Sequence, residues 1–135
     1  MDYKCGTGHS IGFVLNVHEG PPSIRWKVIG GQESRPFAPG MIVSDEPGVY
    51  LEGQYGIRIE TILEVQDREV TGDGRFFCFA PLTKVPLDRD LLEPSLLSER
   101  SREVLNRYHA QVREEILPLL SGRDAEWLLR HTEPL

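Results

Sequence analysis

The stretch from Tyr55 to Gln66 is the feature that most constrains the fold, because β-branched and other apolar residues occupy alternate positions along it. A period of two is typical of a β-strand with one apolar and one polar face. The turn Gly72–Gly74 and the run Arg75–Phe79 predict a further strand. Met41–Glu46 predicts an earlier strand, which Pro47 ends because proline lacks the N–H that a ladder needs. We therefore predict an antiparallel meander.

The C-terminal third changes to a helical period. Ser98 predicts a helix N-cap, and a helix of about 20 residues should follow it. Asp124 is predicted to cap a second, shorter helix, and we interpret His109 and His131 as ordinary residues of surface helices. The strands followed by helices indicate an α+β chain. The apolar residues of the long helix are Val104, Leu105, Tyr108, Val112, Ile116 and Leu119.

Composition narrows the classes of function. The chain has 135 residues, 39% of them apolar and 27% charged, as expected of one folded domain. A net charge of −6 without a Lys/Arg stripe argues against nucleic-acid binding. No apolar run approaches the roughly 20 residues that span a bilayer, and we see no secretory signal. Cys5 and Cys78 are too few for a disulfide framework, so we expect a cytoplasmic protein.

Two carboxylates attract attention. Glu60 shares the polar face of its predicted strand with Arg58, and Glu46 ends the earlier strand at a tight corner. Each could simply face solvent. A hairpin-like return from Pro47 to Gly56, however, would bring Glu46 beside Glu60, about 5 Å away across adjacent strands. Two carboxylates that close repel each other unless one is protonated or a cation lies between them, and a cation is the simpler explanation.

Two histidines lie in the glycine- and proline-rich segment 6–22, and residues 23–40 are predicted to form an irregular connection. His9 and His18 fit ordinary turn and loop positions, but imidazole is also the commonest side-chain nitrogen ligand for transition metals. One histidine with several carboxylates favours Mn, Co or Fe over a structural Zn site. The sequence lacks HExxH, CxxC, GxSxG and P-loop motifs.

Taken together, these segments resemble the successive motifs of the Xaa-Pro aminopeptidases (aminopeptidase P), which are M24 metallopeptidases of the pita-bread fold. Glu46 and Glu60 keep the 14-residue separation of that family (60 − 46). The resemblance extends into the tail, at Asn106–His109 and Glu126–Leu129. The four catalytic motifs are Gly6–Gly12, Leu15–Pro21, Asp45–Tyr50 and Gly56–Glu60.

The resemblance implies a fold and a site. Residues 1–86 would form the second half of a pita-bread catalytic domain, a curved antiparallel sheet with flanking helices, and residues 87–135 a helical C-terminal extension. Two divalent ions, Mn²⁺ foremost and otherwise Co, Fe or Zn, would activate a shared water. The implied roles are a metal ligand at His9, a metal ligand and proton shuttle at Glu46, a ligand bridging both metals at Glu60, a substrate-pocket residue at His18, and residues supporting the ligands at Tyr50 and Arg58.

The sequence departs from the family pattern upstream. The family's ligand order is Asp, Asp, His, Glu, Glu, and only eight residues precede His9, so both aspartates are absent. We therefore expect the chain to be a C-terminal fragment that binds at most one metal weakly and has little peptidase activity alone. Arg58, whose family partner would be one of the missing carboxylates, is expected to pair with Glu60 or Glu46.

The implied partners are a peptide substrate with proline in second position, the missing N-terminal half of the catalytic domain, and a second copy of the chain in a homodimer. A non-catalytic half-domain acting as a binding or assembly module stays open as an alternative. So does a fragment of a prolidase or methionine aminopeptidase relative, although Asn16–Pro21 and the tryptophan-containing tail favour aminopeptidase P.

Overall fold

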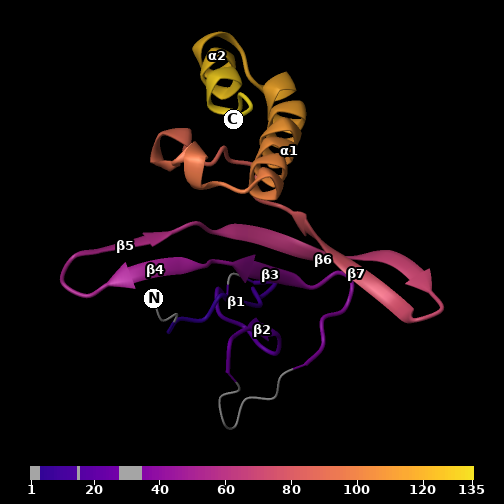
Figure 1. The fold of residues 1–135 in the computed structure, drawn as a ribbon. Coiled ribbons are helices and arrows are strands. Elements are labelled where there is room, and N and C mark those ends of the chain that lie inside the picture. Colours follow the sequence, from indigo (N-terminus) through magenta and orange to yellow (C-terminus); the bar gives the residue numbers. More distant parts are fainter. Residues whose placement is uncertain (1–3, 15, 28–34) are drawn as a thin grey trace. The chain divides into compact units, whose positions relative to one another are not determined.

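The computed structural model describes residues 4–14, 16–27 and 35–135. The chain forms two compact units, Met1–Thr83 and Lys84–Leu135. The first contains strands and the second contains helices (Figure 1). Leu15 and residues 28–34, which belong to the predicted second motif and to the predicted connection, lie outside the described residues. Among the described residues, neither helix is both long enough and apolar enough to cross a membrane.

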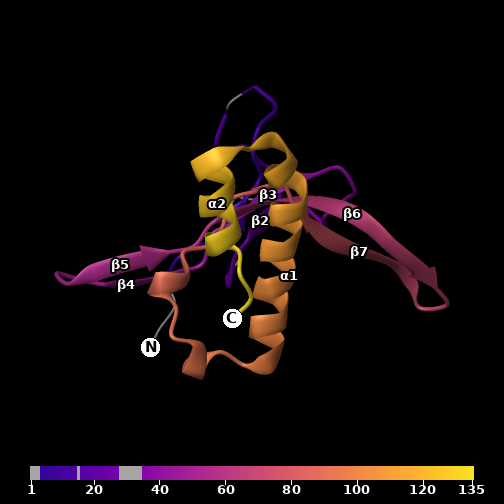
Figure 2. The same ribbon diagram turned by 90° about the horizontal axis from the view of Figure 1, so that it is seen from above.

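The described residues of unit 1 form three antiparallel sheets. Strand β6 (Thr61–Thr71) lies between β3 (Ile42–Asp45) and β7 (Gly74–Pro81), β4 (Gly48–Leu51) pairs with β5 (Tyr55–Arg58), and β1 (Gly8–His9) pairs with β2 (Ser23–Ile24). The β4–β5 and β6–β7 hairpins extend in opposite directions from the β3 region (Figures 1 and 2). The predicted antiparallel arrangement of the strands is confirmed.

The predicted continuous strand from Tyr55 to Gln66 is wrong in one respect. It is divided into β5 and β6, and Ile59 and Glu60 lie between them. The cause is on the facing segment, where β3 ends at Asp45 and Pro47 precedes β4. Proline offers no N–H to a ladder, so pairing stops there and resumes as a separate hairpin.

The N-terminal segment is more regular than predicted. Residues 23–40 were expected to be irregular, yet Ser23 and Ile24 pair with His9 and Gly8 in the β1–β2 ladder. Ser10 forms a bridge to Val43, which joins this segment to β3. A Cβ atom at Gly8 would collide with the carbonyl oxygen of Ser44, so glycine permits this close backbone approach.

Unit 2 contains the helices. Helix α1 (Glu99–Ile116) begins after Ser98, whose hydroxyl accepts from the N–H of Ser101, so the predicted N-cap is confirmed. Helix α2 (Gly122–His131) begins after Ser121. The predicted cap at Asp124 is wrong: Asp124 lies within the first turn, where a negative charge favours the helix dipole. Three short 3₁₀ turns complete the unit: η1 (Arg89–Leu91), η2 (Pro94–Leu96) and η3 (Leu117–Leu119).

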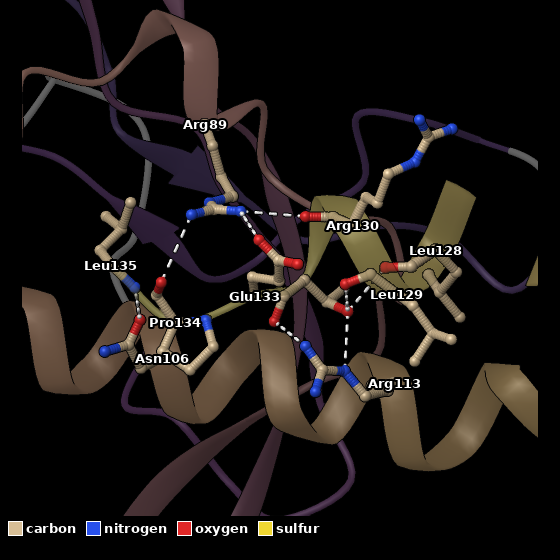
Figure 3. Close-up of polar contacts among 10 residues, drawn as sticks. Arg89, Asn106, Arg113, Leu128, Leu129, Arg130, Glu133, Pro134 and Leu135 are labelled. Atoms are coloured by element: carbon tan, nitrogen blue, oxygen red, sulfur yellow. Dashed lines mark hydrogen bonds and ion pairs between the residues drawn. The ribbon is translucent and has the colours of Figure 1, made fainter. Parts of the chain in front are cut away.

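Two arginines hold the last residues of unit 2 against its helices (Figure 3). Arg89 donates to the carbonyl oxygens of Arg130 and Pro134, at 2.9 and 3.3 Å. Arg113, from α1, donates to the hydroxyl and the carbonyl oxygen of Thr132, which is buried. These bonds link α1 to the end of α2, which lies beside it (Figure 2).

The interpretation of His109 as a surface residue is wrong, because its side chain has no exposed area. Its Nε2 accepts the backbone N–H of Leu87 at 3.1 Å, while its Nδ1 is buried without a hydrogen-bond partner. Burial, followed by the charges of Arg89 and Arg113, lowers the pKa of His109 below its ordinary value. His109 is therefore held neutral inside unit 2.

We predict that acid weakens unit 2 through His109. Because the folded pKa lies below the unfolded value of about 6.5, the contribution of His109 is complete above pH ~6.5 and is lost as the pH falls through and below that value. His109→Gln should remove much of this pH dependence, whereas His131→Gln should retain it. Urea unfolding followed at 222 nm reports unit 2, since both described helices belong to it. If the free energy of unfolding depended on pH equally in the two variants, the assignment to His109 would be contradicted.

Candidate metal centre

Glu46 and Glu60 face each other where the ladder of unit 1 is interrupted. The β3–β6 register ends at Asp45 opposite Thr61, and the β4–β5 register begins at Gly48 opposite Arg58. Between these pairs, the N–H of Ile59 donates to the carbonyl oxygen of Pro47 at 3.4 Å. The hairpin return predicted from the sequence therefore exists, and the two glutamates lie on its opposing segments.

His9 reaches this position from the other side of β3. The backbone N–H of Glu46 donates to the carbonyl oxygen of Thr7 at 2.6 Å, which holds the His9 segment next to the end of β3. His9 Nε2 lies 2.9 Å from a carboxylate oxygen of Glu46, and the two side chains are only 20% and 16% exposed. His9 Nδ1 lies 3.0 Å from the carbonyl oxygen of Ser10. Such a bond fixes the ring and directs Nε2 outward in metal-binding histidines.

Ser44 connects His9 and Glu46 and was missed by the sequence analysis. Its side chain has no exposed area. Its hydroxyl accepts the N–H of His9 at 3.0 Å and donates to Glu46 at 2.9 Å. The signal was present in the sequence, because a serine two residues before Glu46 lies on the same face of the predicted strand Met41–Glu46. Ser44 thus fixes both His9 and Glu46.

Arg58 lies between the two carboxylates. One guanidinium nitrogen is 3.4 Å from Glu46 and another is 3.5 Å from Glu60, so both expected pairings are present. A hydrogen bond to Tyr50, together with the Coulombic attraction of that side chain and of the two glutamates, raises the pKa of Arg58 above its ordinary value. In this structure the guanidinium group of Arg58 therefore contacts both carboxylates, and the predicted metal between them stays a prediction.

The remaining predicted residues lie nearby. The His18 ring is 4.3 Å from the His9 ring, centroid to centroid, and tilted by 47°. Tyr50 packs across the hairpin, where a Cβ atom at Gly48 or Gly56 would collide with its ring. His9, His18 and Glu46 line one cavity of about 1100 Å³. The fold therefore gathers all six predicted site residues into one region of unit 1.

The donor set fits a divalent cation only in part. An imidazole nitrogen and a carboxylate oxygen converge at His9 and Glu46, as they do in sites for Mn, Co, Fe or Zn. Glu60 is joined to this pair through Arg58 rather than directly. Within residues 4–14, 16–27 and 35–135, no three His, Cys, Asp or Glu side chains are arranged to hold an ion. The ligand set of His9, Glu46 and Glu60 stays a prediction.

Comparison with known proteins identifies the family. Residues 1–67 match the model of the metallopeptidase family M24, and residues 75–135 match the model of the C-terminal region of peptidase M24. The chain is 41% identical to a probable Xaa-Pro aminopeptidase P of Laccaria bicolor and 43% identical to the aminopeptidase P2 of Arabidopsis thaliana. Both alignments cover 100% of this chain, but only 22% and 19% of the relatives.

A solved structure agrees with this result. The X-prolyl aminopeptidase of Caenorhabditis elegans, described as a cytosolic enzyme with a di-nuclear active site, matches 96% of this chain and 21% of its own length. The TM-score is 0.79 at 36% sequence identity. The chain is an α+β protein with the second half of a pita-bread fold, and it belongs to the M24 metallopeptidases, within the Xaa-Pro aminopeptidase group. It spans about a fifth of the length of the relatives it matches.

We predict that Ser44→Ala loosens the candidate site. The change leaves the N–H of His9 without its partner and Glu46 with one fewer, which should lower the free energy of unfolding by about 1–3 kcal/mol. It should also weaken Mn²⁺ binding, measured by calorimetry, because both ligands lose their anchor. Val65→Ala is the matched control: it removes core packing from β6 and should destabilise the fold without changing the affinity for Mn²⁺. Equal loss of Mn²⁺ affinity in both variants would show that Ser44 acts only through stability.

Proposed function

We propose that the chain supplies the C-terminal half of the dinuclear metal site of an Xaa-Pro aminopeptidase, an enzyme that releases the N-terminal residue preceding proline. The contact between His9 and Glu46 at 2.9 Å carries this proposal, since it joins residues 37 positions apart (46 − 9) in a partly buried site. Glu60 is the third ligand, within reach of the same Arg58 that pairs with Glu46. The di-nuclear centre described for the nematode neighbour supports divalent metals.

The roles are those that the family resemblance implies, and the positions of the residues support them. Divalent cations held by His9, Glu46 and Glu60 together with further ligands would polarise the substrate carbonyl and lower the pKa of the attacking water. Glu46 takes the proton released by that water and returns it to the leaving amide nitrogen. His18, beside His9 in the same cavity, donates to the carbonyl oxygen as negative charge develops there. Tyr50 and Arg58 hold the carboxylates in place.

The proposal also covers the metal, the domain boundaries, the partners and the location. We propose Mn²⁺ as the metal, because a set rich in carboxylates suits a hard cation, although Co, Fe and Zn accept the same donors. Residues 1–86 belong to the catalytic domain and residues 87–135 to its extension. The partners are an N-terminal half that supplies two aspartates, a second copy of the chain, and a peptide with proline in second position. A cytoplasmic location is supported by the description of the nematode enzyme.

One observation favours a second candidate function. Arg58 contacts both Glu46 and Glu60, so the chain itself offsets part of the negative charge of the two carboxylates. A half-domain whose carboxylates are held by arginine would serve as a binding or assembly module. The two functions differ in whether a divalent ion displaces the Arg58 contacts.

The peptidase proposal is tested by a chimera. The segment of the nematode X-prolyl aminopeptidase that matches this chain would be replaced with residues 1–135, and Mn²⁺-dependent release of the first residue from an Ala-Pro peptide would be measured. We expect activity, and we expect His9→Ala, Glu46→Gln and Glu60→Gln each to reduce kcat/KM by more than about 100-fold. Residues that merely support metal ligands already cost 10–100-fold when removed.

Glu64→Gln is the matched control for the chimera. Glu64 is a β6 glutamate that pairs with Gln66 and belongs to no proposed ligand set, so its removal should leave kcat/KM within about twofold. An active chimera that tolerates Glu46→Gln would refute the assigned ligands, and a folded but inactive chimera would favour the assembly module.

The 135-residue chain by itself should bind Mn²⁺ poorly. Two cations carry a charge of +4, whereas Glu46 and Glu60 supply −2 and already pair with Arg58. We expect calorimetric titration to show at most one weak site, and Arg58→Gln to strengthen it because the competing guanidinium is gone. Arg58→Lys, which keeps the charge, should resemble the parent. Two tight sites on the unaltered chain would contradict this prediction.

A further inference from the structure

The cavity beside His9 and Glu46 has basic side chains that the proposed chemistry does not use. Among the described residues that line it, Glu19 and Glu46 are the two carboxylates, so with the histidines counted as neutral these residues carry a net charge of +2 (4 − 2). The whole chain carries −6. A positive lining on an acidic chain concentrates anions at that cavity. The four lining cations are Lys4, Arg25, Lys27 and Arg35.

These four cations are available to a ligand. In the described part of the chain, every ion pair engages other basic groups, namely His9, Arg58, Arg75, Lys84 and Arg89. Glu46 lines the cavity, but its carboxylate already contacts His9, Ser44 and Arg58. Charged side chains placed around one cavity without partners are ready to form charge-assisted hydrogen bonds, and arginine binds carboxylates in a bidentate manner.

An apolar wall accompanies the cations. Trp26 lines the cavity beside Pro21 and Pro22, and 59% of its surface is exposed. The Nζ atom of Lys27 lies 4.9 Å from the centre of the Trp26 ring, so the cation and the aromatic face are held together. A ligand that fits this lining combines an apolar body with a negative group.

We propose that this cavity selects peptides that carry a carboxylate after the proline, either an acidic side chain or the free C-terminus of a short peptide. At about 1100 Å³ the cavity is at the upper end of small-ligand sites, which suits a peptide of a few residues. The inference rests on the proposed function in taking the ligand to be a peptide, because His9, His18 and Glu46 line the same cavity. A single-stranded nucleic acid is disfavoured by the acidic chain and because Trp26 is the one Trp, Tyr or Phe among the described lining residues.

Binding is measured on the whole chain without metal, through the fluorescence of Trp26. The chain has two tryptophans, so Trp127→Phe leaves Trp26 as the only one. The probes are Ala-Pro-Glu amide, Ala-Pro-Gln with a free C-terminus, and Ala-Pro-Gln amide. We expect each probe with one carboxylate to bind at least about two- to fivefold more tightly than the neutral amide, which is the contribution of an exposed ion pair. This difference in affinity should shrink in 1 M salt, which screens the charges.

Two variants identify the cations responsible. Arg25→Gln combined with Arg35→Gln should abolish the preference for the carboxylate probes, whereas Arg123→Gln, on α2 and outside the cavity lining, should leave it intact. Equal affinity for the three probes, or an undiminished preference in the double variant, would overturn the inference. A preference for only one carboxylate probe supports it and identifies the recognised group. Because the readout needs neither metal nor turnover, an inactive chimera would not affect this result.

Discussion

The candidate site depends on one interruption in backbone pairing. At Pro47 the β3 segment loses the N–H that would continue its ladder, and the facing segment responds by leaving Ile59 and Glu60 outside both β5 and β6. The register is nevertheless the same on both sides of the gap, since Asp45 lies opposite Thr61 and Gly48 lies opposite Arg58. Glu46 and Glu60 therefore lie on opposing segments at the point where one sheet ends and the next begins. The register sets the two carboxylates opposite each other, and the proline limits the backbone bonding around them.

A second constraint comes from the N-terminal segment that carries His9. Gly8 lets the N-terminal segment approach the carbonyl oxygen of Ser44, and the buried Ser44 hydroxyl then joins the backbone of His9 to the carboxylate of Glu46. A buried hydroxyl without partners would cost free energy, so this serine is stable only while both neighbours are in place. Ser44 therefore makes the position of the histidine and that of the glutamate depend on each other.

The sequence could predict those features that rest on local chemistry. The strands from Met41 and from Arg75, the Ser98 cap and the convergence of Glu46 and Glu60 all follow from period, capping and turn residues. The pairing of Ser23 with His9, the burial of His109 and the hydroxyl bridge of Ser44 depend on contacts between distant segments, which periodicity does not encode. The Asp124 cap failed for a different reason, since an acid in a first helical turn and an acid at a cap look alike in sequence.

Charge balance ties the site to its cavity. Two neighbouring carboxylates repel each other unless a cation lies between them, and in this structure the guanidinium group of Arg58 contacts both. Arg58 can hold Glu46 and Glu60 in place until a stronger cation competes for them, because its charge persists at every pH at which the protein folds. In the described part of the chain, no ion pair joins the separate group of cations around the cavity to a carboxylate. These cations are therefore free to pair with a ligand that enters the cavity, whereas Arg58 pairs with carboxylates of the protein itself.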